Sequence, residues 1–418
     1  MAQATSDLGP SRPKPPRAIL PRPSQRRPMF LSGLAEQRSK LKAVPVEDKR
    51  DRSAANVGLS GADVLADEAE RWKYFFDAGC EGWFDGLKAH TFRSSFVELK
   101  REEAACIVEH WEERRRAIAA AETDGRSAAN PEQLAALLAQ AAAHLEPLRE
   151  RLHAAVAAEC AASSAGLAFV KLSTRSPKDS RTALAKAEAA YAVRLAEATE
   201  GVVSDDNERW KILSEEVTRA GAVASGAAAL EMLLDSERIF EDLEYALRGP
   251  KGAEAEAGVY NMSLVARAWD PRLTLQSEFR GIAWGGRLTC LCQYVHPLCF
   301  SELLGLKDRI EVDCCELFAK PEVTSAVQSL GGNCIIDFAW LGPGDVIIVE
   351  LNPFDGVCLG TFPASTGLFL WEEERDRAIM KGEAPFETRI RTERLSSAAL
   401  KAQCNPDWRR IIYGETKV

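Results

Sequence analysis

The chain has 418 residues, of which 46% are hydrophobic and 28% are charged, and its formal net charge is −9 at pH 7. This length allows two to three structural units, and no apolar run approaches the length that spans a bilayer. The charge is uneven, because residues 1–50 carry eleven Lys and Arg against four Asp and Glu, which leaves −16 for the rest. An acidic body disfavours nucleic acid as the main partner. We therefore expect a soluble protein that binds neither membranes nor nucleic acid.

The N-terminal segment differs in composition from the rest of the chain. Residues 1–50 hold eight of the twenty prolines and show no apolar periodicity. Such a segment cannot bury enough surface to offset its ordering entropy. We interpret residues 1–58 as a disordered basic arm that acts as a solvated tail, with organellar targeting or docking as the alternative. The odd number of cysteines, eleven, indicates free thiols in a reducing compartment, so we expect a cytoplasmic protein.

Residues 59–165 are predicted to form an N-terminal segment that contains a helical hairpin insertion. A helix is expected from about Ser60 to Phe76, and the aromatic and β-branched residues of 91–99 indicate an extended stretch. Helical spacing then covers residues 101–122 and, after a first-turn proline, residues 131–162. Nothing in this insertion suggests chemistry.

From residue 166 onward, short apolar strands alternate with helices. Strands are expected at 167–172, 258–268, 276–284, 287–294, 333–340 and 345–351, and helices near 181–199, 205–218, 225–248 and 308–330. Tight turns at Gly285-Gly286 and at residues 342–345 join two hairpins. Antiparallel strands with interleaved helices predict an α+β fold. We divide this region into an N-terminal lobe (166–257), a C-terminal lobe (258–380) and a C-terminal tail (381–418).

The second hairpin carries a candidate metal site. A turn centred between Pro343 and Gly344 pairs residue 341 with 346, and this register places Asp337 opposite Glu350 with Asn352 on the same face. The surrounding strand residues are apolar, and directly opposed carboxylates in such a setting repel. A divalent cation would relieve the repulsion, and two carboxylates with an amide oxygen suit Mg²⁺ better than Zn²⁺. The alternatives are that Arg or Lys neutralises the pair, or that a bulge shifts the register and separates the carboxylates.

Several short motifs occur in a fixed order around these residues. They are Lys171 followed by Ser176–Asp179, then Leu264–Trp269, Glu278–Arg280, Asp337–Phe338, Glu350–Phe354 and Trp371–Glu373. In this order they resemble the cell division cycle protein 123 family, whose members are divergent ATP-grasp proteins. The resemblance covers residues 80–100 and 166–375 and implies a two-lobed ATP-grasp-like fold with ATP and Mg²⁺ in the cleft. No Walker A motif is present, which argues against a P-loop NTPase.

The resemblance also implies a role for each candidate residue. The residues expected to contact ATP are Lys171, Ser173, Ser176, Lys178 and Asp179 at the phosphates, the backbone of Val265 and Arg267 at adenine, and Arg280 at the γ-phosphate. Asp337, Glu350 and Asn352 would hold Mg²⁺, and Arg280 would stabilise charge if a phosphoryl group is transferred. For Arg280 an alternative stays open, namely a salt bridge to Glu278 or to another acid.

The family resemblance suggests a partner and a function. Family members assemble translation initiation factor 2 by binding its gamma subunit, so we expect a monomeric, nucleotide-dependent assembly chaperone. The alternatives are an ATP-grasp ligase or transferase that activates a carboxylate as an acyl-phosphate, and a binding module with little turnover. Two departures bear on this choice: Glu350 stands where relatives have Asp, and residues 293–297 replace a charged run. The sequence leaves the use of ATP open.

Overall fold

The computed structural model describes residues 73–123, 131–248, 260–354, 366–371, 373–404 and 406–415. Residues 59–418 form one compact unit. The expected basic arm, the expected helix start at Ser60 and Glu372 of the last motif lie outside the described residues.

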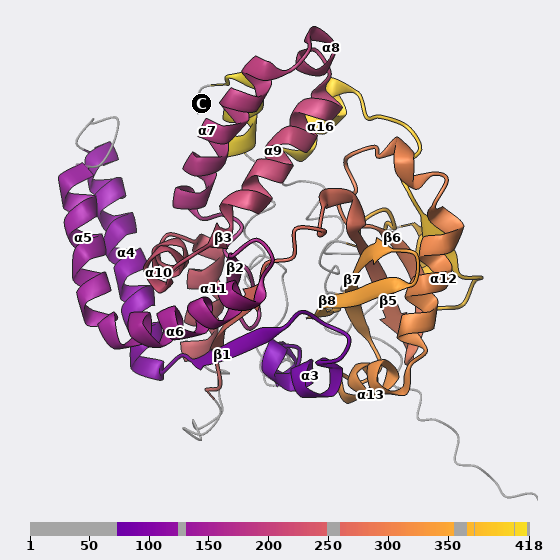
Figure 1. Ribbon diagram of the computed structural model, residues 1–418, viewed down its shortest axis with the longest axis horizontal. Helices are drawn as coiled ribbons and strands as arrows, with labels where there is room; N and C mark the ends of the chain where they lie inside the picture. Colours follow the sequence, from indigo (N-terminus) through magenta and orange to yellow (C-terminus); the bar gives the residue numbers. More distant parts are fainter. Residues whose placement is uncertain are drawn as a thin grey trace, which may run out of the picture. The chain divides into compact units, whose positions relative to one another are not determined.

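Helices and two sheets make up the described chain, which confirms the α+β class (Figure 1). The strands are β1 (Ser94–Glu98), β2 (Ala168–Leu172), β3 (Ala222–Val223), β4 (Ser263–Ala268), β5 (Glu278–Trp284), β6 (Arg287–Gln293), β7 (Cys334–Gly342), β8 (Asp345–Pro353) and β9 (Glu387–Arg389). The helices of the first half are α3 (Cys80–Leu87), α4 (Arg101–Thr123), α5 (Pro131–His144), α6 (Glu146–Ala162), α7 (Arg181–Glu197), α8 (Glu200–Val203), α9 (Asp206–Ala220), α10 (Gly226–Leu234) and α11 (Glu237–Arg248). Those of the second half are α12 (Lys307–Phe318), α13 (Pro321–Ser329), α15 (Glu374–Met380), α16 (Ser397–Gln403) and α17 (Pro406–Tyr413).

The first sheet has the strand order β1-β4-β2-β3, and all its pairs are antiparallel. Helix α6 packs on β1, β2 and β4, and α10 packs on α6, so this sheet shares a core with the helical insertion. The single helix expected over 131–162 is interrupted at Leu145. Pro147 lies in the first turn of α6 and has no N–H to donate, so α5 cannot continue through it.

The second sheet has the order β8-β7-β5-β6-β9. The two expected hairpins are present and lie side by side through the β5–β7 pair. Gly285 and Gly286 have φ values of 58° and 75°, the left-handed backbone that a two-residue hairpin turn requires. Helix α12 packs on β6, β7 and β8, α13 packs on α12 and α3, and both helices contribute to a core with Phe279 and Phe338.

Two elements differ from the expected lobe assignment. Strand β4 follows residue 258, where we placed the second lobe, yet it is the inner strand between β1 and β2 of the first sheet. The segment 381–418, expected as a tail, contains β9, α16 and α17. Strand β9 runs parallel to β6, so the second sheet takes its fifth strand from this segment.

Helices α16 and α17 return from the second sheet to pack on α9. Trp408 of α17 makes an edge contact with Trp210 of α9, with ring centroids 5.3 Å apart. Arg410 donates two hydrogen bonds of 2.6 Å to the Glu188 carboxylate of α7. The C-terminal helices therefore link the second sheet to the α7–α9 pair.

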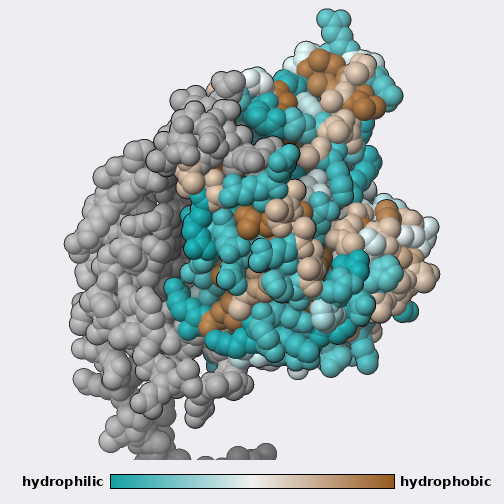
Figure 2. All heavy atoms as spheres, turned by 90° about the vertical axis from the view of Figure 1, so that its left-hand side faces the viewer, coloured by the Kyte–Doolittle hydropathy of each residue, from teal (hydrophilic) through white to brown (hydrophobic). Residues whose placement is uncertain are grey.

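The face of the molecule that Figure 2 shows is mainly hydrophilic where its residues are coloured. On the face that Figure 2 shows, hydrophobic side chains lie in small separate groups among hydrophilic ones. The large hydrophobic residues with the greatest exposure are Val193, Val203, Leu304, Val312 and Leu370. Within the described ranges, no helix has both the length and the apolar content required to cross a bilayer.

Candidate functional site

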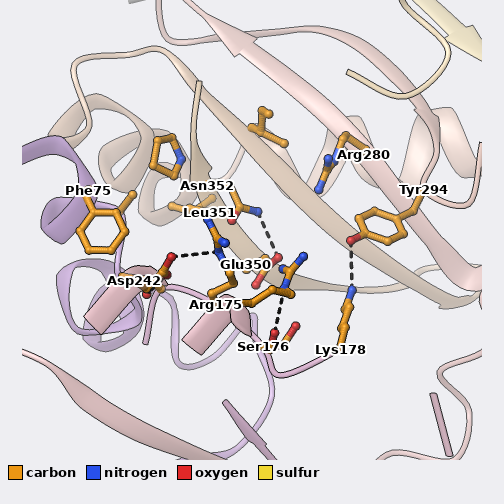
Figure 3. Close-up of a pocket in the computed structure, with 15 residues that line it drawn as sticks. Phe75, Arg175, Ser176, Lys178, Asp242, Arg280, Tyr294, Glu350, Leu351 and Asn352 are labelled. Atoms are coloured by element: carbon orange, nitrogen blue, oxygen red, sulfur yellow. Dashed lines mark hydrogen bonds and ion pairs between the residues drawn. The ribbon is translucent and has the colours of Figure 1, made fainter. Parts of the chain in front are cut away.

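A polar cavity of about 370 Å³ lies between the β2–α7 loop of the first sheet and strands of the second sheet. Its wall is formed by Phe75, Ala78, Thr174, Arg175, Ser176, Lys178, Arg238, Asp242, Arg280, Tyr294, Ile335, Glu350, Leu351, Asn352 and Pro353. In Figure 3, Phe75 lies on one side, Arg280 and Tyr294 lie on the other, and Glu350 lies between them. The cavity thus has Phe75 at one end and the cations Arg280 and Lys178, with the ring of Tyr294, at the other.

The β7–β8 hairpin places two carboxylates opposite each other. Asp337 pairs with Glu350, which confirms the predicted register at this point. The predicted pairing of residues 341 and 346 is wrong, because Trp340 pairs with Val346. The register shifts once between Trp340 and Gly342 and once more between Asp337 and Phe338. The two shifts cancel, so the carboxylates meet despite the irregular hairpin.

Each of these carboxylates is held by a cation, as in one alternative that the sequence left open. Lys171 Nζ donates to Glu350 Oε2 at 2.6 Å. Arg280 binds Asp337 through two bonds, Nε to Oδ1 at 2.8 Å and a terminal nitrogen to Oδ2 at 2.7 Å. Lys171 is 2% exposed and Asp337 is 1% exposed, and neither lines the cavity. The four formal charges cancel, so the cluster is neutral as a whole.

Burial and these neighbours shift the pKa values of the acids. Burial alone raises the pKa of Glu350, but Lys171 and Lys178 outweigh it and hold this pKa well below 4.5. Burial raises the pKa of Asp337 above 3.8, although Arg280 opposes the shift. Burial likewise raises the pKa of Glu278, opposed by the charge of Lys178. Glu350 is therefore the acid of this group whose anionic form is most strongly favoured.

Asn352 lies between the two carboxylates. Its Nδ2 donates to Asp337 Oδ2 at 3.2 Å and to Glu350 Oε1 at 3.1 Å. Oxygens at adjacent corners of an octahedral Mg²⁺ shell lie about 3.0 Å apart, given bonds of about 2.1 Å. A half-turn of the amide would put its oxygen at this position. The donor set therefore fits a magnesium ion, provided that Asn352 rotates.

The other ligands of such an ion would have to come from outside the protein. Among the described residues, no group of three His, Cys, Asp or Glu side chains is arranged to hold a metal. The site consists of two carboxylates and one amide, so phosphate oxygens or water must complete an octahedral shell.

The loop between β2 and α7 brings some of its expected residues to the cavity. Ser176 and Lys178 line the wall, and Lys178 Nζ donates to the Tyr294 hydroxyl at 3.0 Å (Figure 3). Asp179 does not line the cavity. Its carboxylate accepts from Ser236 Oγ at 2.5 Å and from the Arg238 backbone N–H at 3.0 Å, so it caps the start of α11.

Three further expected contacts are not at the cavity wall. Ser173 is buried, and its N–H donates to the Ser263 carbonyl at 2.9 Å. Val265 and Arg267 lie on β4, which is paired with β1 on one side and β2 on the other. The ladder uses their backbone groups, so these are not available to adenine, contrary to our expectation.

Sequence reasoning missed several cavity residues. Arg238 donates from Nε to the Ser176 carbonyl at 3.1 Å, and no motif signalled it. Arg175 pairs with Asp242 at 3.0 Å. Tyr294 lies in the run that departs from the family pattern, and its ring centroid is 4.7 Å from the Arg280 guanidinium.

Comparison with known proteins finds similar solved structures. No family model matches the sequence, and no curated protein matches it. Among solved structures, it is similar to Cdc123 from Schizosaccharomyces pombe, at 15% identity and a TM-score of 0.44 over 76% of this chain and 97% of that chain. A C-terminally truncated Cdc123 from the same organism matches at 15% identity and a TM-score of 0.44 over 77% of this chain and 98% of that chain.

Proposed function

We propose that the cavity binds ATP together with Mg²⁺. The observation that carries this proposal is the hairpin cluster, in which Asp337, Glu350 and Asn352 converge within hydrogen-bond distance beside two cations, the buried Lys171 and the partly buried Arg280. A neutral cluster of this kind needs no ion for its own stability. It would need one if its cations were withdrawn to bind an anion, and a triphosphate brings the negative charge that makes such an exchange favourable.

Two cations of the cluster would bind phosphate by changing partners. Lys171 and Arg280 now neutralise Glu350 and Asp337. In the proposed complex both turn toward phosphate oxygens, and Asp337, Glu350 and Asn352 hold the metal. When bound, Mg²⁺ would offset part of the negative charge of the carboxylates and of the phosphate oxygens. Arg280, with its planar donor fork, is then suited to the terminal phosphate.

The distribution of side chains favours one direction for the nucleotide. Lys178 and Arg238 add positive charge around the cavity, beyond the neutral cluster, whereas Arg175 is paired with Asp242. Phe75, Leu351 and the other apolar wall residues are suited to a base rather than to phosphate. We therefore place adenine toward Phe75 and the triphosphate toward Lys178 and Arg280, in place of the contact with β4 expected from the sequence.

The purpose of nucleotide binding is proposed from the motif resemblance. We infer an assembly chaperone for translation initiation factor 2 that acts through the gamma subunit of that factor. An ATP-grasp ligase or transferase is the alternative, and it predicts ADP release that depends on an added carboxylate and amine. A pull-down with the gamma subunit, run beside an ADP-release assay, separates the two.

Calorimetry of ATP binding tests the site itself. We expect wild type to bind ATP at least tenfold more tightly with Mg²⁺ than without it, and Asp337→Asn to lose this difference. Asp376→Asn is the matched control. Asp376 does not line the cavity, but it is also buried, and it accepts two hydrogen bonds, of 2.8 and 2.6 Å, from Arg389. Binding that is unchanged in Asp337→Asn and reduced in Asp376→Asn would contradict the assignment.

A further inference from the structure

Strand β8 contains a bulge beside the carboxylate pair. Asp337 opposes Glu350, but the next residue, Phe338, opposes Ile348, so Val349 has no partner on β7. The Val349 carbonyl instead accepts a hydrogen bond of 2.7 Å from a terminal nitrogen of Arg267, which lies on β4 of the other sheet. An extra residue in one strand of a pair bends the strand and re-aims the side chains that follow it.

The same edge of β8 is held at the preceding residue. The Ile348 N–H donates to the His90 carbonyl at 2.7 Å, and Thr91 Oγ1 donates to the Ile348 carbonyl at 2.7 Å. Contacts from the first sheet and from the segment before β1 therefore hold two consecutive residues, Ile348 and Val349. The bulge is located where β8 meets these elements.

Arg267 makes this contact from a buried position without a carboxylate partner among the described residues. It is 5% exposed, its described partners are the Val349 carbonyl, the Cys80 thiol and the rings of Trp83 and Phe92, and its Nε has no hydrogen-bond partner among the described residues. Burying a guanidinium without a carboxylate partner is unfavourable. If this position needed packing alone, methionine or leucine would fill it without the penalty of burying a charge.

The bulge determines which side of β8 faces the cavity. A second shift near the turn, between Trp340 and Gly342, moves the register by one residue, and the Val349 bulge moves it back. Without the Val349 bulge, Asp337 would oppose Val349. A slip of one residue turns every following side chain to the other face of the sheet, so Glu350 and Asn352 would point away from Lys171.

We infer that Arg267 is a positioning residue for the proposed ATP and Mg²⁺ site. By holding the Val349 carbonyl, it fixes the register that presents Glu350 and Asn352 to the cavity. The inference rests on the proposed function for its ligand-binding consequence only. Its structural content, the pairing of Lys171 with Glu350, is measurable without any nucleotide.

The test uses a zero-length carbodiimide cross-link on the full chain. Glu350 is 21% exposed and lies 2.6 Å from the Lys171 ammonium, so activation of its carboxyl gives an amide between these two residues. The Lys401–Glu415 pair, at 2.7 Å, serves as the internal control. Peptide mass spectrometry quantifies both products, and ATP affinity is measured on the same samples.

In Arg267→Met we expect the Lys171–Glu350 product to fall at least fivefold and ATP affinity at least tenfold, with the Lys401–Glu415 product unchanged. If Arg267→Met does not fold, Arg267→Lys is used. It keeps the charge but carries all its donors on one nitrogen, so it cannot reproduce the fork that contacts the Val349 carbonyl and the Cys80 thiol, and it should lower the cross-link at least twofold. A folded variant with a wild-type yield of the Lys171–Glu350 product overturns the inference. Loss of this product in a protein whose wild type binds no ATP upholds the positioning role and refutes the proposed function.

Discussion

Replacing Lys171 by Met should destabilise the fold through the partner that it leaves behind. Lys171 is 2% exposed and bonds Glu350 at 2.6 Å. Removal of one member of a buried ion pair costs about 3–5 kcal/mol. Glu350 is 21% exposed and keeps the Asn352 amide at 3.1 Å, which reduces this cost. We therefore expect a loss of about 2–3 kcal/mol in the free energy of unfolding.

A double-mutant cycle, followed by denaturant unfolding, measures this loss in the free energy of unfolding. In Lys171→Met/Glu350→Gln no charge is left unpaired, so the loss should fall to about 1 kcal/mol, and the coupling between the two sites should exceed about 1 kcal/mol. Arg410→Met removes a partly exposed ion pair with Glu188 and should cost less than about 1 kcal/mol. Equal losses in Lys171→Met and in the double mutant would refute the reasoning, because the stranded carboxylate would then contribute nothing.

Three further predictions follow from the site. The folded-state pKa of Glu350 is lowered from 4.5, so the stability that its charged form gives to the fold is complete above pH 4.5 and is lost as the pH falls below that value. The stability difference between wild type and Glu350→Gln should therefore shrink in acid denaturation curves recorded below pH 4.5. A constant difference would contradict this. Asp179→Ala removes the acceptor of the Ser236 hydroxyl and the Arg238 N–H, so unfolding should be easier by about 1–2 kcal/mol, whereas a change below about 0.3 kcal/mol would exclude the capping role. Because Lys171 and Arg280 neutralise the cluster, calorimetry should show that Mg²⁺ alone binds at least tenfold more weakly than Mg²⁺ in the presence of ATP. Tight binding of the metal alone would argue against the proposal that these two cations leave the carboxylates for phosphate.

The sequence predicted the carboxylate pair correctly, although the reasoning was incomplete. Counting outward from the turn gave Asp337 opposite Glu350, and the structure agrees. The count assumed a regular ladder, whereas two compensating shifts occur on the way. The shift at Val349 has no glycine or proline beside it to signal it, and its contact partner, Arg267, is 82 residues away in the chain. Local sequence carries no information about such a contact.

The expected contact of the Arg267 backbone with adenine disagrees with the structure for a related reason. Spacing and composition identified a strand at residues 258–268 but not its neighbours. The order β1-β4-β2-β3 makes β4 an inner strand, and an inner strand has no free backbone groups. The expected helices over 131–162 and 225–248 were found with a break in each, at Leu145 and at Asp235-Ser236. The first break follows from Pro147, which was visible in the sequence. The second depends on Ser236 contacting Asp179, which was not.

The contact between α17 and α7 has a consequence for the order in which the protein folds during synthesis. Arg410 bonds Glu188, which precedes it by 222 residues. Translation adds about 5–20 residues per second, so α7 and α9 leave the ribosome on the order of 10–40 s before α17 is made. During this interval the face of Trp210 that Trp408 later contacts is uncovered. The face of the α7–α9 pair that carries Trp210 and Glu188 is therefore open to association with other chains until α17 arrives.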